Sequence, residues 1–500
     1  MIKWKAVNIF RLILLFAVLF AGKSSLAQIS GSLFMNTTNF YAQINNPSYF
    51  RTDKATAFSV AGFAGLSFVN QGNFKISEAI TLDNAGNPVI DFIHFYENSK
   101  EENIIRQDVA VPVLYAGLPL NDGYFHFYYN ENMTAISGIR KEALAFLSNG
   151  NLLAEYHNFN SEEIRLSGLG YREFAFGYAK PLNDLLHVGI RAKLLFGAAQ
   201  ADTRSWDYGV EASADGDSVT LIAGGTGQMM LPLPLNLRAD NSILSVNTDG
   251  AFQKYMSTYQ NPGFAIDLGF NYSKGDQHFF SAALRDLGAI WFRNQSFNVA
   301  QDESLVFAGF DLVGAIRYPE EGGYYNPGEL VRIIKEDIRD VYQPVVAEAK
   351  YLYWMPVKSV LHYHYQYSSR HLFGVTSQMA FQRKNVRSVF TLSAQQKWLN
   401  FSVFENVNLQ GINGVTLGGG FQYEGEYAQI FVATDNLVAI YHPAANKTFS
   451  LNFGICFLLN HKKEVNEKSI APARGKASRY LPFYEQKNKR KSIKFKESLL

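Results

Sequence analysis

The chain has 500 residues, of which 47% are hydrophobic and 15% aromatic, with a formal net charge of +2. Beyond residue 27 it contains no run of about 18 apolar residues, which excludes a helical membrane protein. The single cysteine, Cys456, excludes an internal disulfide and a thiolate metal site. Charge is uneven, because residues 461–500 hold twelve Lys or Arg against four Glu.

Residues 1–27 are typical of a secretory signal peptide. Basic side chains flank the start of an apolar run at 12–21, and Ser25-Leu26-Ala27 is a small-x-small cleavage site. The mature chain is therefore expected to begin at Gln28. An uncleaved membrane anchor is the alternative, for which the apolar run is short.

Three further regions follow. Residues 28–54, rich in Asn, Thr and Tyr, are expected to form an N-terminal periplasmic segment that enters the lumen of a barrel. Residues 55–460 are expected to form the barrel. Residues 461–500, rich in Lys, Glu, Ser and Pro, are interpreted as a basic periplasmic tail.

Strict two-residue alternation marks the segment Leu186–Phe196. Its even-numbered residues are all apolar, whereas His187, Arg191 and Lys193 occupy the other face. One buried face of a soluble sheet can produce this pattern. Because it recurs along an exported chain, we predict an all-β fold, a closed antiparallel transmembrane β-barrel with apolar side chains toward lipid.

Fifteen segments show strand patterns, and the turn at Met355-Pro356 is expected to separate two of them. A barrel with both termini in the periplasm needs an even number, so we expect fourteen strands, with sixteen as the next estimate. Long insertions at 70–106, 200–261 and 293–346 are expected to be extracellular loops with short helices, including one after Asn326. The segments are 58–68, 107–118, 124–129, 173–179, 186–196, 263–272, 278–288, 347–354, 360–367, 372–381, 389–396, 401–407, 415–423, 427–434 and 448–459.

Polar residues at inward positions of the strands are the candidate site. Charged groups inside a narrow barrel usually pair with one another, because isolated buried charges are costly. A polar path or a substrate site is the alternative. His362 and His364 share one strand face, but without a third ligand we expect polar lumen lining rather than a metal site. The lumen-facing candidates are Glu173, Arg191, Lys193, Asp267, Arg285, Asp286, His362 and His364.

No catalytic motif is visible in the sequence. There is no Gly-x-Ser-x-Gly, no phosphate-binding Gly-rich loop before a helix and no zinc signature. We therefore expect a non-enzymatic protein without catalytic residues, cofactors or a metal. No nucleic-acid partner is expected.

Several blocks resemble a known family. Tyr171–Ala179 with Val188–Gly197, then Gly263–Gly269 with Arg285–Trp291, and finally Thr434-Asp435-Asn436-Leu437 resemble a Bacteroidota outer-membrane barrel family with no assigned function. That family is similar in turn to FadL-type barrels, which carry hydrophobic molecules, and to PorV-like barrels, which are scaffolds in secretion. Their Asn-Pro-Ala motif is represented here by Asn46-Pro47-Ser48.

Two functions are consistent with this sequence. The resemblance implies a channel or transporter for small or hydrophobic molecules in the bacterial outer membrane, in contact with its lipid. The alternative is a structural or accessory subunit of an outer-membrane assembly or secretion complex. In that case residues 461–500 are expected to contact a periplasmic or outer-membrane protein partner.

Overall fold

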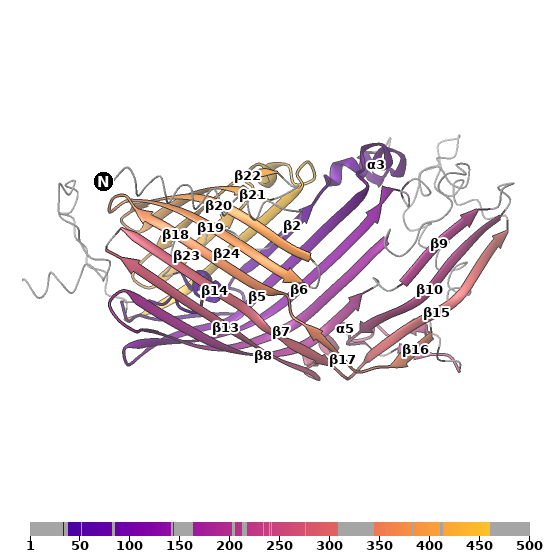
Figure 1. The fold of residues 1–500 in the computed structure, drawn as a ribbon, viewed down its shortest axis with the longest axis horizontal. Coiled ribbons are helices and arrows are strands. Elements are labelled where there is room, and N and C mark those ends of the chain that lie inside the picture. Colours follow the sequence, from indigo (N-terminus) through magenta and orange to yellow (C-terminus); the bar gives the residue numbers. More distant parts are fainter. Residues whose placement is uncertain are drawn as a thin grey trace, which may run out of the picture.

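The computed structural model shows an elongated β-barrel (Figure 1). The expected signal peptide at 1–27, the helix after Asn326 and the tail at 461–500 lie outside the described residues. The structure describes residues 34, 39–51, 53–82, 86–141, 144, 164–202, 206–212, 218–233, 235–239, 241, 243–275, 277–308, 345–382, 385–410 and 414–460.

Antiparallel strands form the barrel wall, and short helices lie inside the barrel, at one of its ends or against its outer face. The helices are α2 (Phe40–Asn45), η2 (Ile76–Glu78), α3 (Phe92–Asn98), α5 (Ala251–Ser257) and α8 (Val438–Tyr441). The wall consists of β1 (Thr56–Val60), β2 (Leu66–Gly72), β5 (Glu102–Leu120), β6 (Gly123–Arg140), β7 (Ile164–Pro181), β8 (Leu186–Asp202), β13 (Asn261–Lys274), β14 (His278–Phe292), β17 (Tyr351–Trp354), β18 (Val357–Gln366), β19 (His371–Gln382), β20 (Asn385–Trp398), β21 (Phe401–Leu409), β22 (Val415–Glu424), β23 (Ala428–Thr434) and β24 (Thr448–Leu459).

Four strands continue the sheet beyond the wall and form what we call the extension. Residues 200–202 at the end of β8 pair with residues 228–230 of β10. β10 also pairs with β9 and β15, and β15 pairs with β16. The extension consists of β9 (Trp206–Ala212), β10 (Ser218–Met230), β15 (Ser296–Ala308) and β16 (Val345–Glu348). Two small hairpins complete the set, β3 (Ile80–Leu82) with β4 (Pro88–Ile90), and β11 (Leu235–Leu237) with β12 (Ile243–Val246).

The barrel is closed, because β24 pairs with β1 and β2, which in turn pair with β5. β1 with β2 and β17 with β18 each make one interrupted wall strand. The described wall therefore has fourteen strands, which confirms the predicted number and the antiparallel closed fold.

The strand predicted at 347–354 is wrong. β16 joins the extension, whereas β17 pairs with residues 289–292 of β14, next to the β14 residues that pair with β18. The backbone N–H of Met355 donates to the Gly288 carbonyl at 3.0 Å. The chain therefore continues along the same neighbour through Met355-Pro356 instead of turning, and this removes one of the fifteen predicted strands.

The first wall strand is interrupted where the sequence predicts continuity. Residues 61–65 leave the ladder between β1 and β2, and Phe63 projects outward with half of its surface exposed. Its carbonyl accepts a hydrogen bond from the Ile455 N–H at 2.8 Å, and Gly65 has a φ of +105°. The wall at this point is a loop that remains tied to β24.

Connections at the two ends of the barrel differ in length. At the end where β1 begins and β24 ends, the hairpins turn within 121–122, 182–185, 367–370 and 425–427. The long connections after β2, β8 and β14 all lie at the opposite end, where the extension projects (Figure 1). Among the described residues, no helix is both long and apolar enough to cross a membrane.

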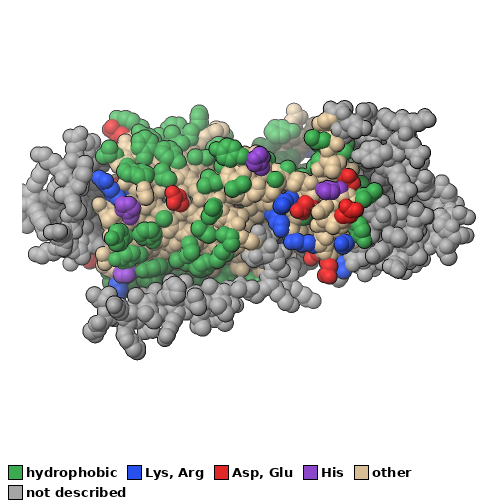
Figure 2. All heavy atoms as spheres, turned by 90° about the horizontal axis from the view of Figure 1, so that it is seen from above, with side chains coloured by type: hydrophobic (Ala, Val, Ile, Leu, Met, Phe, Trp, Pro, Cys, Tyr) green, Lys and Arg blue, Asp and Glu red, His purple; other side chains and the backbone are tan. Residues whose placement is uncertain are grey.

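The outer wall is apolar, and the charged side chains of the wall strands are buried in the interior beside apolar clusters. On β8, Ile190 and Leu194 are 55% and 47% exposed, while Arg191 and Lys193 between them are completely buried. Hydrophobic side chains cover much of the wall in Figure 2, and most charged side chains in that view lie toward its ends. This is the reverse of the distribution in a soluble sheet.

Candidate functional site

The interior of the barrel is occupied by the segment 39–50, which we call the plug. Its helix α2 begins where the Asn39 side chain accepts a hydrogen bond from the Tyr41 N–H at 2.8 Å, and it ends at Asn46, whose backbone is extended before Pro47. Every residue of α2 is buried. A helix of six residues is unstable alone, so contacts with the wall must hold it.

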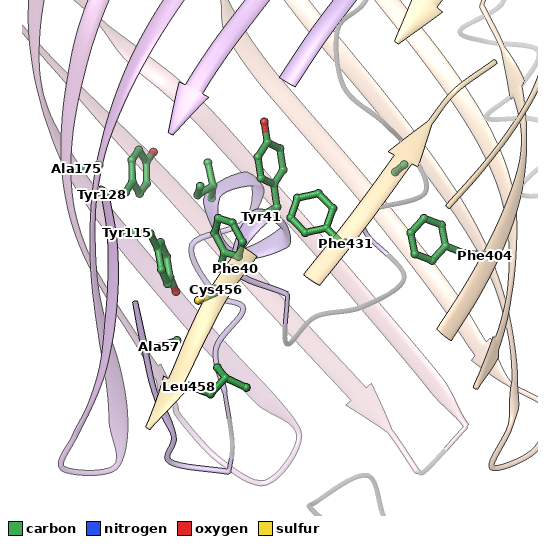
Figure 3. Packing of buried hydrophobic residues seen from close by; sticks show 12 residues of the cluster. Phe40, Tyr41, Ala57, Tyr115, Tyr128, Ala175, Phe404, Phe431, Cys456 and Leu458 are labelled. Atoms are coloured by element: carbon green, nitrogen blue, oxygen red, sulfur yellow. The ribbon is translucent and has the colours of Figure 1, made fainter. Parts of the chain in front are cut away.

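One side of the plug is apolar. Phe40 packs against Tyr115 of β5 and Phe431 of β23, with ring centroids 5.2 and 5.7 Å apart, and Tyr41 also contacts Phe431 (Figure 3). A Cβ on Gly454 would lie 3.0 Å from the Phe40 ring, so glycine there permits the close packing.

The other side of the plug is polar. Arg191 of β8 donates to the Gln43 carbonyl at 2.5 Å and to the Ile44 carbonyl at 2.7 Å. Arg285 of β14 donates to the Asn45 side chain. Because charged donors make stronger hydrogen bonds than neutral ones, these arginines are strong anchors for α2.

Neutral contacts hold the remaining parts of the plug. The Asn39 side chain donates to Gln422 of β22 at 2.8 Å, and Asn271 of β13 donates to the Ser48 carbonyl at 3.0 Å. The hydroxyl groups of Tyr49 and Ser281 are 2.6 Å apart. The plug therefore bonds to strands on opposite sides of the lumen and bridges its cross-section.

A cluster of paired charges lies beneath the polar side of the plug. The Lys193 ammonium is 3.0 Å from Glu173, 2.9 Å from Asp267 and 2.6 Å from Asp286. Arg191 is 2.9 Å from Asp267, and Lys358 of β18 is 3.0 Å from Asp286. All of these groups except Lys358 are at least 95% buried, and each opposite charge offsets the desolvation cost of its neighbour.

A β-bulge brings two consecutive charges into this cluster. Asp267 of β13 faces both Arg285 and Asp286, because the pairing shifts between Ile266 and Leu268. Asp286 has a φ of +62°, and its N–H donates to the Asp267 side chain at 2.8 Å. The extra residue reverses the alternation of β14, so both side chains are buried in the interior.

The structure brings six of the eight predicted residues into direct contact with this cluster or the plug. His362 and His364 lie further along β18, with His362 Nε2 3.1 Å from His364 Nδ1 and His362 Nδ1 2.8 Å from the Thr376 hydroxyl. Phe279 stacks on His364 with ring centroids 4.4 Å apart. Among the described residues, no group of three or more His, Cys, Asp or Glu side chains is placed to hold a metal ion.

Sequence reasoning missed the plug residues and two polar residues of β6. His126 accepts from Arg191 at 3.0 Å, and the Tyr128 hydroxyl donates to Glu173 at 2.5 Å. Both have inward parity on β6, and that parity could have identified them. The contacts of Gln43 and Asn45 carry no such signal, because residues 39–50 do not alternate.

Comparisons with known proteins identify one matching family. A family model described as a family of unknown function (DUF5723) matches residues 50–435, which confirms the expected likeness to a family without assigned function. Its Bacteroidota origin stays a prediction. No curated protein matches the sequence.

Two solved structures illustrate the likeness. The toluene transporter TbuX of Ralstonia pickettii is 11% identical with a TM-score of 0.40, and the match covers 83% of this chain and 92% of that one. The toluene transporter TodX of Pseudomonas putida is 10% identical with a TM-score of 0.38, and the match covers 87% of this chain and 95% of that one.

Proposed function

The chain belongs to the family of unknown function DUF5723, so we infer its function from its own residues and propose that it is a non-enzymatic barrel of the bacterial outer membrane that transports small apolar molecules. The apolar outer wall supports a lipid environment. The short turns and both barrel termini at one end support a periplasmic face, with the long connections outside.

The observation that carries this proposal is an apolar cluster in the lumen at the apolar side of the plug. It lies where the plug meets the wall, and its wall residues come from β1, β5, β6, β7, β21, β23 and β24 (Figure 3). An apolar surface inside a water-accessible barrel is costly unless it is covered, and here the plug covers it. The cluster consists of Phe40, Tyr41, Ile44, Ala57, Tyr115, Tyr128, Ala175, Phe404, Phe431, Ala433, Cys456 and Leu458.

We infer that transport requires a shift of the plug that uncovers this apolar surface. When the plug shifts, Phe40 leaves its contacts with Phe431 and Tyr115, and an apolar solute can then contact these two rings instead. The loop 61–65 interrupts the wall beside Gly454, which contacts Phe40. We infer a route in which a solute enters at the outer end, binds this surface and leaves after the plug shifts.

Uptake of an apolar naphthylamine dye by cells that produce the full chain tests the proposal. Cells with the protein should accumulate dye faster than cells without it, and Phe431→Gln should slow accumulation several-fold. Ser393→Gln, which places the same amide on a buried position of β20 outside the cluster, is the control and should keep the rate. Equal rates with and without the protein would contradict transport.

A second candidate function rests on the extension. β10 and β15 pair over their full lengths, Ser218–Met230 against Ala308–Ser296, and carry the sheet well past the wall (Figure 1). We propose as the alternative that the extension binds a protein partner outside the cell, while the basic tail 461–500, which follows β24 at the opposite end of the barrel, binds another in the periplasm. Pull-down in mild detergent with the full chain should recover both partners, and pull-down with the tail replaced by Gly/Ser should recover the outer partner alone. Recovery of the protein by itself in both would contradict this alternative.

A further inference from the structure

An ion pair lies on the outer face of the barrel, where lipid contact makes charge expensive. Glu173 of β7 points inward, so the preceding Arg172 faces outward, beside Glu131 of β6 at 2.7 Å. A charged side chain that faces lipid is energetically costly, most of all near the bilayer midplane. Yet Arg172 is completely buried.

The segment 251–259 covers this pair from outside. Arg172 donates to the Thr258 carbonyl at 2.5 Å and to the Tyr255 carbonyl, and its guanidinium lies 5.0 Å from the Tyr255 ring and 4.6 Å from the Tyr259 ring. The Tyr255 hydroxyl donates to Glu131 at 3.1 Å. Burial, reinforced by Glu131, raises the pKa of Tyr255 to about 12 and keeps this donor protonated. α5 is thereby bound to the outside of β6 and β7.

One face of α5, next to Tyr255, is apolar and exposed. Phe252 and Met256, four residues apart on one helix face, are 76% and 41% exposed. Tyr259 packs on Phe174 and Phe196, outward residues of β7 and β8. The exposed face of α5 is therefore continuous with the apolar outer wall.

A second segment makes the same kind of contact on another part of the wall. Leu437 folds over the outer face of β22, where its N–H donates to the Leu417 carbonyl at 2.8 Å and its side chain lies 3.6 Å from a Cβ built on Gly419. Asn436 anchors the segment by donating to the Thr448 carbonyl at 3.0 Å. The turn α8 then exposes Val438, Ile440 and Tyr441, the last by 81%.

We propose that α5 and α8 are interfacial anchors, whose exposed apolar faces enter the boundary between headgroups and acyl chains of the outer leaflet. This inference rests on the proposed membrane location of the barrel. The occupant of both faces is lipid, because each face continues the apolar wall and α5 shields a charged pair that would otherwise meet acyl chains. The anchors set the depth of the barrel and keep the extension in water.

Nitroxide accessibility of the full chain in liposomes tests this proposal. In a Cys456→Ser background, labels are attached at Phe252→Cys and Ile440→Cys. Leu194→Cys on the barrel wall serves as the lipid reference. Ser245→Cys on β12 serves as the water reference, since the β11–β12 hairpin packs on the extension through Leu235 and Ile243.

Labels at 252 and 440 should collide more with oxygen than with a water-soluble nickel complex, as at 194, and the label at 245 should do the reverse. A label at 252 that behaves like 245 while 194 reports lipid would overturn the anchor proposal alone. A label at 194 that reports water would overturn the membrane location itself. Met256→Cys provides a second position on α5 if Phe252→Cys does not fold.

Discussion

Gly189 and Gly269 face each other across β8 and β13, and the plug lies directly over both. A Cβ on Gly189 would lie 2.1 Å from the Pro47 carbonyl oxygen, and one on Gly269 would lie 2.2 Å from the Asn46 side-chain oxygen. Neither separation is sterically allowed. The glycine pair therefore forms a flat seat in the wall that fits Asn46-Pro47.

Replacing one glycine of this seat should displace the plug. Gly269→Ala places a methyl group where the Asn46 side chain lies, so we expect higher and noisier conductance in planar bilayers than with the parent chain. Gly168→Ala is the matched control, because its Cβ would meet no atom closer than 3.8 Å. Identical traces from the two variants would show that the seat does not hold the plug.

Removing Arg191 should destabilise the barrel interior. Arg191→Met leaves Asp267 with a weaker set of partners and the Gln43 and Ile44 carbonyls without their donor. Breaking a buried ion pair costs about 3–5 kcal/mol. The double variant Arg191→Met/Asp267→Asn should lose less stability than the two single variants added together. Urea unfolding in micelles measures these free energies, and strict additivity would show that the pair is not coupled.

The bulge at Asp286 should distinguish charge from backbone conformation. Asp286→Asn keeps a residue that tolerates positive φ but removes the negative charge that Lys193 and Lys358 contact. We expect this change to lower the free energy of unfolding by about 1.5–3 kcal/mol. Asp286→Val adds backbone strain of about 1–3 kcal/mol. Valine should therefore lower the unfolding free energy further than asparagine. Equal losses would mean that the bulge relaxes when its side chain changes.

Arg172 should hold α5 on the wall through its planar group. Arg172→Lys keeps the charge but cannot donate to Glu131, Tyr255 and Thr258 together while lying between two rings. Hydrogen exchange of the amides of α5 should therefore accelerate. Arg293→Lys, an exposed arginine over the Trp291 ring, is the control and should leave that exchange unchanged. Unchanged exchange in Arg172→Lys would show that other contacts retain α5.

Residue parity explains why much of the wall could be predicted. Along Leu186–Phe196 the alternation places Arg191 and Lys193 on one face, and the structure buries both. Parity failed where the pairing between neighbouring strands is irregular. It did not predict the bulge at Asp286, the loop at 61–65 or the continuation through Met355-Pro356, because each depends on the strand that lies alongside.

Residue parity likewise predicted one part of the candidate site and not the other. The charged residues that line β7, β8, β13 and β14 could be selected by their inward positions, whereas the plug could not be placed, since residues 39–50 have no period. Their position depends on Gly189 and Gly269, which are far away in the sequence. Likewise, nothing near Arg172 indicates that Tyr255 and Tyr259 would cover it.

The sequence by itself determined that this chain forms a closed barrel with an apolar exterior, because two-residue alternation is a local consequence of extended backbone geometry. Only the tertiary structure decided what fills the barrel and what lies on its outer face. Closure brings together side chains from segments hundreds of residues apart, and their complementary shapes and charges have no local signature.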